Sequence, residues 1–192
     1  QNPKHVAISL NGEPTLYSRL SEYMELCHSH GMTTMLVTNG TLPKVIEKLD
    51  TLPTQLYVSV DAPNKEVFDE ICRPKWNAAA WDKFEETIDL LPSLDTRVVC
   101  RHTLIKGKNM NPEHIPQYAA LDNRADPDWI ECKGYVHVGN SRENLTAENM
   151  PFHEDILDFS RALAPLTDRK LLDDSPPSRV ALVGKEIVPI PI

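Results

Sequence analysis

The chain has 192 residues, with 20 Lys and Arg against 28 Asp and Glu, which gives a formal net charge of −8. That length is typical of one domain. The acidic balance argues against a general nucleic-acid coat, although a local basic patch could still bind RNA. No apolar run approaches the ~20 residues that a membrane span requires, so we expect a cytoplasmic protein without a membrane partner.

The spacing of glycine and cysteine excludes several common cofactor sites. No two of the seven Gly are separated by a single residue, so the chain has no GxGxxG dinucleotide motif. Gly134 and Gly139 have the spacing of a P-loop, but Asn140 stands where that motif needs Lys. The four Cys, at 27, 72, 100 and 132, are too far apart for a local zinc or iron–sulfur site. We expect buried, reduced thiols and no metal ligands within the chain.

Segments typical of strands alternate with segments typical of helices. We predict strands at 5–10, 33–38, 55–60, 96–105, 129–133 and 178–183, and helices at 16–30, 43–49, 79–91, 112–121 and 152–163. Strands joined by helical crossovers indicate an α/β fold with a parallel sheet, open or curled towards a barrel.

Polar or ionisable groups follow five of the predicted strands, in the segments 11–14, 38–40, 59–61, 106–109 and 131–134. Asn-Gly and Lys-Gly pairs are also ordinary turn sequences. The carboxyl ends of parallel strands converge on one rim, where cofactors and substrates bind in such folds. Five polar ends on the same rim therefore favour a functional site there.

Residues 9–16, SLNGEPTL, resemble the GGE-type motif of radical S-adenosylmethionine (SAM) enzymes. Further segments resemble one branch of that superfamily, the wyosine-base synthases, which make 4-demethylwyosine in tRNA. They are LVTNG (36–40), QLYVSVDA (55–62), LIKG (104–107), IECKGY (130–135) and NMP (149–151). The tail at 173–180 is similar to the archaeal form, and the resemblance covers nearly all of the chain.

The resemblance implies a partial (β/α) radical SAM barrel of parallel strands with flanking helices. Its first strand and the CxxxCxxC segment would lie upstream of Gln1, residues 1–165 would form the barrel, and residues 166–192 an extension packed on it. The implied cofactors are SAM and [4Fe–4S] clusters ligated by Cys upstream of this chain. We therefore expect this chain alone not to cleave SAM.

The implied reaction is that of a tRNA-modifying lyase. A radical derived from SAM takes hydrogen from the methyl group of N1-methylguanosine beside the anticodon, and a two-carbon unit of pyruvate closes the third ring. The implied partners are tRNA, pyruvate and an electron donor, and we expect a monomer. Two alternatives stay open, namely another radical SAM enzyme such as an activase, and a tRNA-binding module without catalysis.

Six rim residues are candidates for binding SAM. A carboxylate suits the SAM ammonium, side-chain donors suit its carboxylate or ribose, and an arginine fork suits the carboxylate of SAM or pyruvate. The candidates are Glu13, Thr38, Asn39, Ser59, Asp61 and Arg101. The structural alternatives are turn residues, a helix cap at Asp61 and an ion pair at Arg101.

The remaining candidates concern substrates. Lys106 and Lys133 could form a Schiff base with a keto acid, with Glu131 as the third catalytic candidate, although salt bridges or phosphate contacts would also use these lysines. Asn109, Arg73 and Lys75 are the candidates for substrate binding. Trp76 and Trp81 lie close enough in sequence to supply a surface for stacking on a base, and the alternative for Trp81 is the core.

Overall fold

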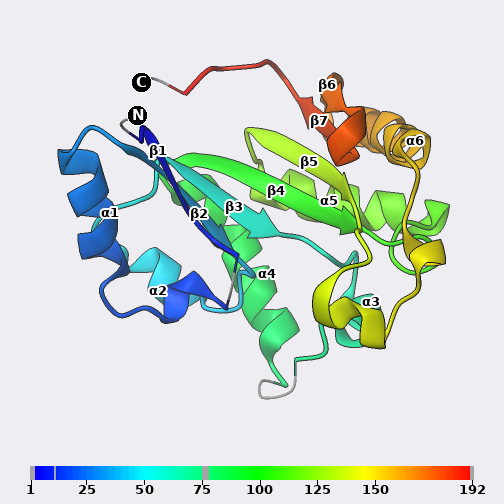
Figure 1. The fold of residues 1–192 in the computed structure, drawn as a ribbon, viewed down its shortest axis with the longest axis horizontal. Helices are drawn as coiled ribbons and strands as arrows, with labels where there is room; N and C mark the ends of the chain where they lie inside the picture. Colours follow the sequence, from blue (N-terminus) through cyan, green and yellow to red (C-terminus); the bar gives the residue numbers. More distant parts are fainter. Residues whose placement is uncertain (1–2, 11, 75–77, 191–192) are drawn as a thin grey trace.

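The computed structural model describes residues 3–10, 12–74 and 78–190. Within them, seven strands form one sheet in the order β1-β2-β3-β4-β5-β7-β6 (Figure 1). Their bounds are β1 His5–Ile8, β2 Thr33–Thr38, β3 Gln55–Ser59, β4 Arg97–Leu104, β5 Trp129–Gly134, β6 Lys170–Ser175 and β7 Val180–Gly184. The first five strands are parallel, as predicted, and follow one another in chain order.

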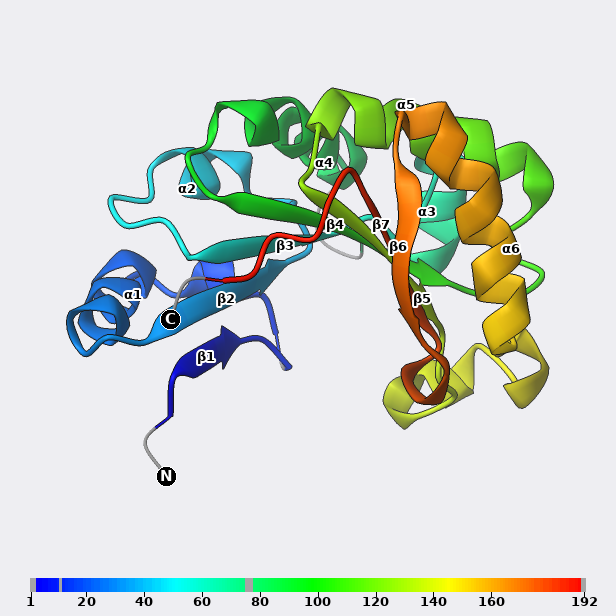
Figure 2. The ribbon, with the colours of Figure 1, turned by 90° about the horizontal axis from the view of Figure 1, so that it is seen from above.

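Helices line the outer side of this sheet, which follows an arc in Figure 2. They are α1 Leu20–Ser29, α2 Pro43–Glu47, α3 Lys65–Ile71, α4 Ala80–Leu90, α5 Ile115–Ala125 and α6 His153–Leu163. The arc and the parallel strands agree with the expected partial barrel. None of the helices in the described ranges is long and apolar enough to cross a membrane.

The ends of several elements are shifted by a few residues, as in α5, for which 112–121 was predicted, and three elements differ more clearly. The first helix starts at Leu20 because Pro14–Leu16 forms a separate 3₁₀ turn, whose first amide, that of Thr15, is capped by the Glu13 carboxylate. Helix α3 was missed, although Asn64 caps it by accepting a hydrogen bond from the Val67 amide at 3.0 Å. The edge strand β6 was also missed, and it pairs antiparallel with β7, which is itself antiparallel to β5.

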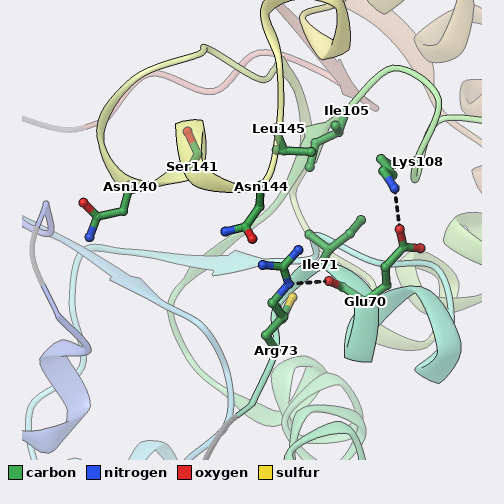
Figure 3. A pocket seen from close by; sticks show the side chains of 10 residues that line it. Glu70, Ile71, Arg73, Ile105, Lys108, Asn140, Ser141, Asn144 and Leu145 are labelled. Carbon is green, nitrogen blue, oxygen red and sulfur yellow. Dashed lines mark hydrogen bonds and ion pairs between the residues drawn. The ribbon is translucent and has the colours of Figure 1, made fainter.

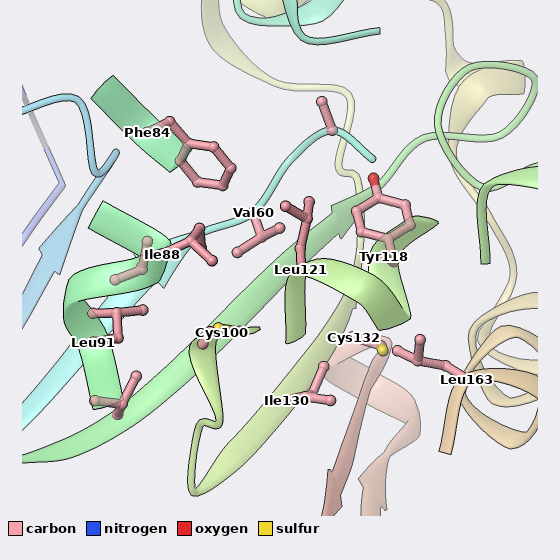
Figure 4. Packing of buried hydrophobic residues seen from close by; sticks show 14 of the residues in the cluster. Val60, Phe84, Ile88, Leu91, Cys100, Tyr118, Leu121, Ile130, Cys132 and Leu163 are labelled. Atoms are coloured by element: carbon pink, nitrogen blue, oxygen red, sulfur yellow. The ribbon is translucent and has the colours of Figure 1, made fainter. Parts of the chain in front are cut away.

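The core lies between the sheet and its helices (Figure 4). Alternate residues of β4 and β5 point into it, so Cys100, His102 and Cys132 are fully buried. Arg101 and Glu131 belong to the opposite set and are partly exposed on the inner face of the arc. The inner face of the arc and the adjoining rim therefore carry partly exposed polar side chains that can bind a ligand.

A buried polar pair connects β4 to α5 within the core. His102 Nε2 lies 3.0 Å from Asp122 Oδ1, and both side chains are completely buried. The ring of Tyr118 packs on the imidazole, with 4.5 Å between the ring centroids. This pair fixes the helix side of β4, whose other side carries the candidate site residue Arg101.

Candidate functional site

The Glu13 carboxylate joins the ends of β1 and β2. Its Oε1 accepts hydrogen bonds from Thr38 Oγ1 at 2.7 Å, Thr15 Oγ1 at 2.7 Å and the Thr15 amide at 3.1 Å. Its Oε2 accepts one from the Asn39 amide at 2.8 Å. A carboxylate offers about four lone-pair positions, two on each oxygen. Oε2 therefore keeps room for one more donor, and the carboxylate is held rigidly for it.

Thr38 and Asn39 have different capacities for binding. The Thr38 hydroxyl is buried, donates to Glu13 and accepts from the Gly40 amide at 3.1 Å, so it positions Glu13. Asn39 is exposed, and its Oδ1 accepts from the amide and the hydroxyl of Thr41. Its side-chain nitrogen, Nδ2, has no partner among the described residues. Asn39 is therefore the one of the two that can donate to a ligand.

Ser59 and Asp61 lie at the end of β3, in line with the prediction that they share a side. Ser59 is half-buried, and the structure gives its hydroxyl no partner among the described residues. Asp61 Oδ1 accepts from the Thr103 amide at 3.2 Å, and burial raises the pKa of this carboxyl. Asn64, not Asp61, caps the following helix. A contact of either group with the hydroxyl groups of a ribose stays a prediction.

Arg101, Glu131 and Tyr57 form a cluster across three neighbouring strands. Arg101 Nε lies 2.8 Å from Glu131 Oε1, and the guanidinium carbon lies 4.5 Å from the centroid of the Tyr57 ring. The Tyr57 hydroxyl donates to Glu131 Oε2 at 3.3 Å, and burial, followed by the charge of Glu131, raises the pKa of Tyr57. The terminal nitrogens of Arg101 are unpaired among the described residues, so they can bind a carboxylate.

The two candidate lysines have different surroundings. Lys133 is half-buried on β5, faces the same side as Glu131, and has no ion-pair partner among the described residues. Lys106 is exposed, with its Nζ 3.4 Å from Asp155 Oδ2 and 5.5 Å from the centroid of the Phe152 ring. Lys133 is therefore the candidate whose amine is free for a reaction.

Asn109 holds the loop after β4. It is fully buried, its Nδ2 donates to the carbonyl oxygens of Asp61 and Thr103 at 2.8 Å each, and its Oδ1 accepts from the Ile105 amide at 2.6 Å. Both amide protons are used in these bonds. The predicted substrate contact would have to break them, so the structure corrects the role of Asn109 to that of a positioning residue.

Arg73 lines a cavity of about 330 Å³ between the end of α3 and the segment 140–145 (Figure 3). Its backbone is left-handed, with φ 48°, and its Nε donates to the Glu70 carbonyl at 3.0 Å. The guanidinium faces Asn144 across the cavity, while Lys108 and Glu70 form an ion pair on another wall. The other predicted substrate residue here, Lys75, lies outside the described residues, as do Asn11 and Trp76. Trp81 is buried in the core.

The described residues do not fit an iron–sulfur cluster. Cys27, Cys100 and Cys132 are buried, as predicted, whereas Cys72 is exposed, which corrects the expectation for that residue. Although the Cys72 residue as a whole is exposed, desolvation of its thiol, followed by the charges of Asp61 and Asp69, raises its pKa to about 12. Burial raises the pKa of Cys132 to about 12 as well. Within the described ranges, no group of three or more His, Cys, Asp or Glu could hold a metal ion. Ligands for a cluster would have to come from outside these residues.

Two family models match the chain. The model of the radical SAM superfamily matches residues 1–120, and a model described as wyosine base formation matches residues 124–185. The chain belongs to the radical SAM superfamily. Within it, the predicted resemblance to the wyosine-base synthases is confirmed by the relatives.

The chain is 43% identical to the SAM-dependent tRNA 4-demethylwyosine synthase of Pyrococcus horikoshii, over 97% of the chain and 55% of that protein. It is 44% identical to the synthase of Methanocaldococcus jannaschii, over 96% of the chain and 57% of the relative. The chain thus spans little more than half the length of these curated relatives.

Solved structures agree with these relatives. A structure of TYW1 with a lysine–pyruvate adduct bound is 42% identical, with a TM-score of 0.86 over 95% of this chain and 57% of that one. A domain of a pyruvate-formate lyase-activating enzyme from Bacteroides vulgatus has a TM-score of 0.64 over 86% of this chain and 95% of that one. Its 16% identity shows a shared fold alone.

Proposed function

We propose that this chain is the part of a tRNA 4-demethylwyosine synthase that holds SAM and pyruvate beside N1-methylguanosine in tRNA. The observation that carries the proposal is the 43% identity to the Pyrococcus horikoshii synthase over 97% of the chain. The rim adds a chemical reason, because its free groups match the parts of SAM and of a keto acid.

The free groups on the rim divide the recognition of SAM among three strand ends. Glu13 Oε2 accepts from the ammonium, Asn39 Nδ2 donates to the carboxylate, and Ser59 and Asp61 bond to the ribose. When bound, SAM would supply the radical chemistry that abstracts a hydrogen atom from the guanosine methyl group. An iron–sulfur cluster is proposed to be ligated outside this chain, which alone should not cleave SAM.

Pyruvate is assigned to the inner face of β4 and β5. In register, Arg101 is opposite Glu131 and Thr103 is opposite Lys133, so the two cations lie on adjacent strands. The terminal nitrogens of Arg101 bind the pyruvate carboxylate. Lys133 Nζ attacks the ketone carbon, a carbon–nitrogen bond forms, and the carbonyl oxygen leaves as water. Glu131 carries the protons that this exchange moves.

Neither alternative has an observation in its favour. The likeness to an activating enzyme is limited to the fold at 16% identity. A tRNA-binding module without catalysis does not explain an unpaired lysine beside an arginine fork. The lyase chemistry, the electron donor, the monomeric state and the cytoplasmic location remain predictions.

Trapping of pyruvate tests the proposal. The chain is incubated with carbon-13 pyruvate and cyanoborohydride, and the modified lysine is located by peptide mass spectrometry. We expect labelling at Lys133, its loss in Lys133→Arg and its retention in Lys106→Arg. Thermal melts show that the variants are folded. The absence of a label at Lys133, or equal labelling of exposed lysines, would argue against the proposal.

A further inference from the structure

Phe152 presents an aromatic ring to solvent at the rim. The residue is 74% exposed and lies outside the core, directly before helix α6. Isolated exposed apolar residues are common. This one differs because its backbone is fixed and its ring lies beside a cation.

The backbone on both sides of the ring is anchored. The Phe152 amide donates to Asp155 Oδ2 at 2.7 Å, which caps α6. Three residues earlier, Asn149 and Lys106 exchange two hydrogen bonds of 2.9 Å, from the Lys106 amide to the Asn149 carbonyl and from Asn149 Nδ2 to the Lys106 carbonyl. The segment is thus fastened to the end of β4, and little conformational entropy would be lost when a ligand stacks on the ring.

Two cations flank this segment. Lys106 Nζ lies 5.5 Å from the centroid of the Phe152 ring, and its only carboxylate partner among the described residues is Asp155 at 3.4 Å. Arg179 Nη1 lies 3.4 Å from the carbonyl oxygen of Pro151, the residue before Phe152. An aromatic face with adjacent cations is the combination by which proteins bind unpaired bases and their phosphates.

We propose that Phe152 stacks on an unpaired base of the RNA substrate, while Lys106 and Arg179 contact the neighbouring phosphates. The inference rests on the proposed function in that RNA is the substrate, and it assigns the stacking surface to Phe152. A protein partner fits less well, because charged residues are depleted at the centre of protein interfaces, whereas Lys106 lies over this ring and Asp155 is bonded to the backbone amide of the same residue.

A fluorescent base analogue tests the proposal directly. The wild-type chain is titrated with a uridine-rich single-stranded oligoribonucleotide that contains one 2-aminopurine, a base whose fluorescence is quenched by stacking. Anisotropy gives the affinity. Substitutions at Phe152 should preserve the cap of α6, since Asp155 accepts from the backbone amide. The matched control is Leu166→Ala, an exposed apolar residue beyond the opposite end of α6.

We expect Phe152→Ala and Phe152→Leu to weaken binding on the order of 10-fold and to abolish the quenching, because a stacked base contributes this much. Phe152→Trp should retain both, and Leu166→Ala should change neither. Unchanged quenching in Phe152→Ala, or no binding by the wild-type chain, would overturn the proposal. Full affinity in Phe152→Leu would indicate an apolar, protein-like contact and would also overturn it. Pyruvate trapping at Lys133 uses no RNA, so failure here is distinguishable from failure of the proposed function.

Discussion

The Glu13 carboxylate accepts a hydrogen bond from the Thr38 hydroxyl at 2.7 Å, and this contact joins the loop after β1 to the last residue of β2. The two strands are neighbours in the sheet, but their ends are separated by helix α1 in the sequence. Thr38 is buried, and its hydroxyl donates to Glu13 and accepts from the Gly40 amide. The other oxygen of Glu13, Oε2, accepts from the Asn39 amide alone and so has a lone pair to spare.

Removing the charge of Glu13 should weaken SAM binding more than it weakens the fold. In Glu13→Gln, the loss of a charge-assisted hydrogen bond of about 1.5–3 kcal/mol should lower SAM affinity at least 10-fold. Thr38→Val is the control, since it removes the buried hydrogen bond, costs about 1 kcal/mol of stability and keeps the carboxylate. Equilibrium dialysis with SAM and urea denaturation measure the two effects. Equal losses of affinity in both variants would contradict the role of Glu13.

Gly40 should tolerate a side chain worse than Gly31 does. Both have a positive φ, near 70°, so alanine at either position costs about 1 kcal/mol of backbone strain. At Gly40, a Cβ would also lie 3.2 Å from Phe84 Cδ2 and 3.3 Å from Val58 Cγ1, whereas Gly31 has nothing within 4 Å. We expect the free energy of unfolding to fall by about 2–4 kcal/mol in Gly40→Ala and by about 1 kcal/mol in Gly31→Ala. Equal values in urea denaturation would refute the close packing.

Asp61 should make the stability depend on pH. Burial raises its pKa in the fold, so its ionisation opposes folding. This cost is absent below the unfolded pKa of about 4 and grows as the pH rises through the folded value. Asp61→Asn keeps an oxygen to accept from the Thr103 amide and removes the titration. The variant should gain stability over the wild type as the pH rises from 4 to 8. A difference that is constant over this range would contradict the burial of the charge.

The cysteines should behave as unreactive thiols. Desolvation of the thiol raises the pKa of Cys72 and of Cys132 to about 12, with the charges of Asp61 and Asp69 adding to the effect at Cys72, so at pH 8 almost none of either is thiolate, the form that reacts. We expect iodoacetamide to alkylate both slowly in the folded chain and rapidly after denaturation. Mass spectrometry of tryptic peptides measures each rate. Cys72 is the decisive residue, since it is exposed, and rapid labelling in the fold would show that its pKa is not raised.

The sequence was most informative where local pattern and tertiary packing agree. The five parallel strands could be predicted from their apolar residues, and the face of Arg101 from the alternation along β4. Strand β6 could not, because none of its residues is fully buried and its pairing with β7 is an edge contact. Helix α3 has only seven residues, too few to show the hydrophobic periodicity by which a helix is recognised in sequence.

Side-chain roles were harder to predict than positions. The sequence placed Thr38 and Asn109 at the rim. Only the structure shows that the Thr38 hydroxyl bonds to Glu13 and that the Asn109 amide bonds to backbone carbonyls. Tyr57 was missed, although it lies two residues before Ser59 and therefore on the same face of β3. Its contact with Glu131 joins residues 74 positions apart in the chain, which no local pattern could reveal.

The most direct test of the proposed function is the nucleoside made by a hybrid enzyme. The part of the Pyrococcus horikoshii synthase that this chain matches at 43% identity is replaced by the chain, and circular dichroism confirms that the hybrid is folded. Mass spectrometry of the digested tRNA then follows N1-methylguanosine. We predict its conversion to 4-demethylwyosine with carbon from labelled pyruvate, and loss of the product in a Lys133→Arg hybrid. A folded hybrid with bound cofactors that leaves N1-methylguanosine unchanged would contradict the proposal.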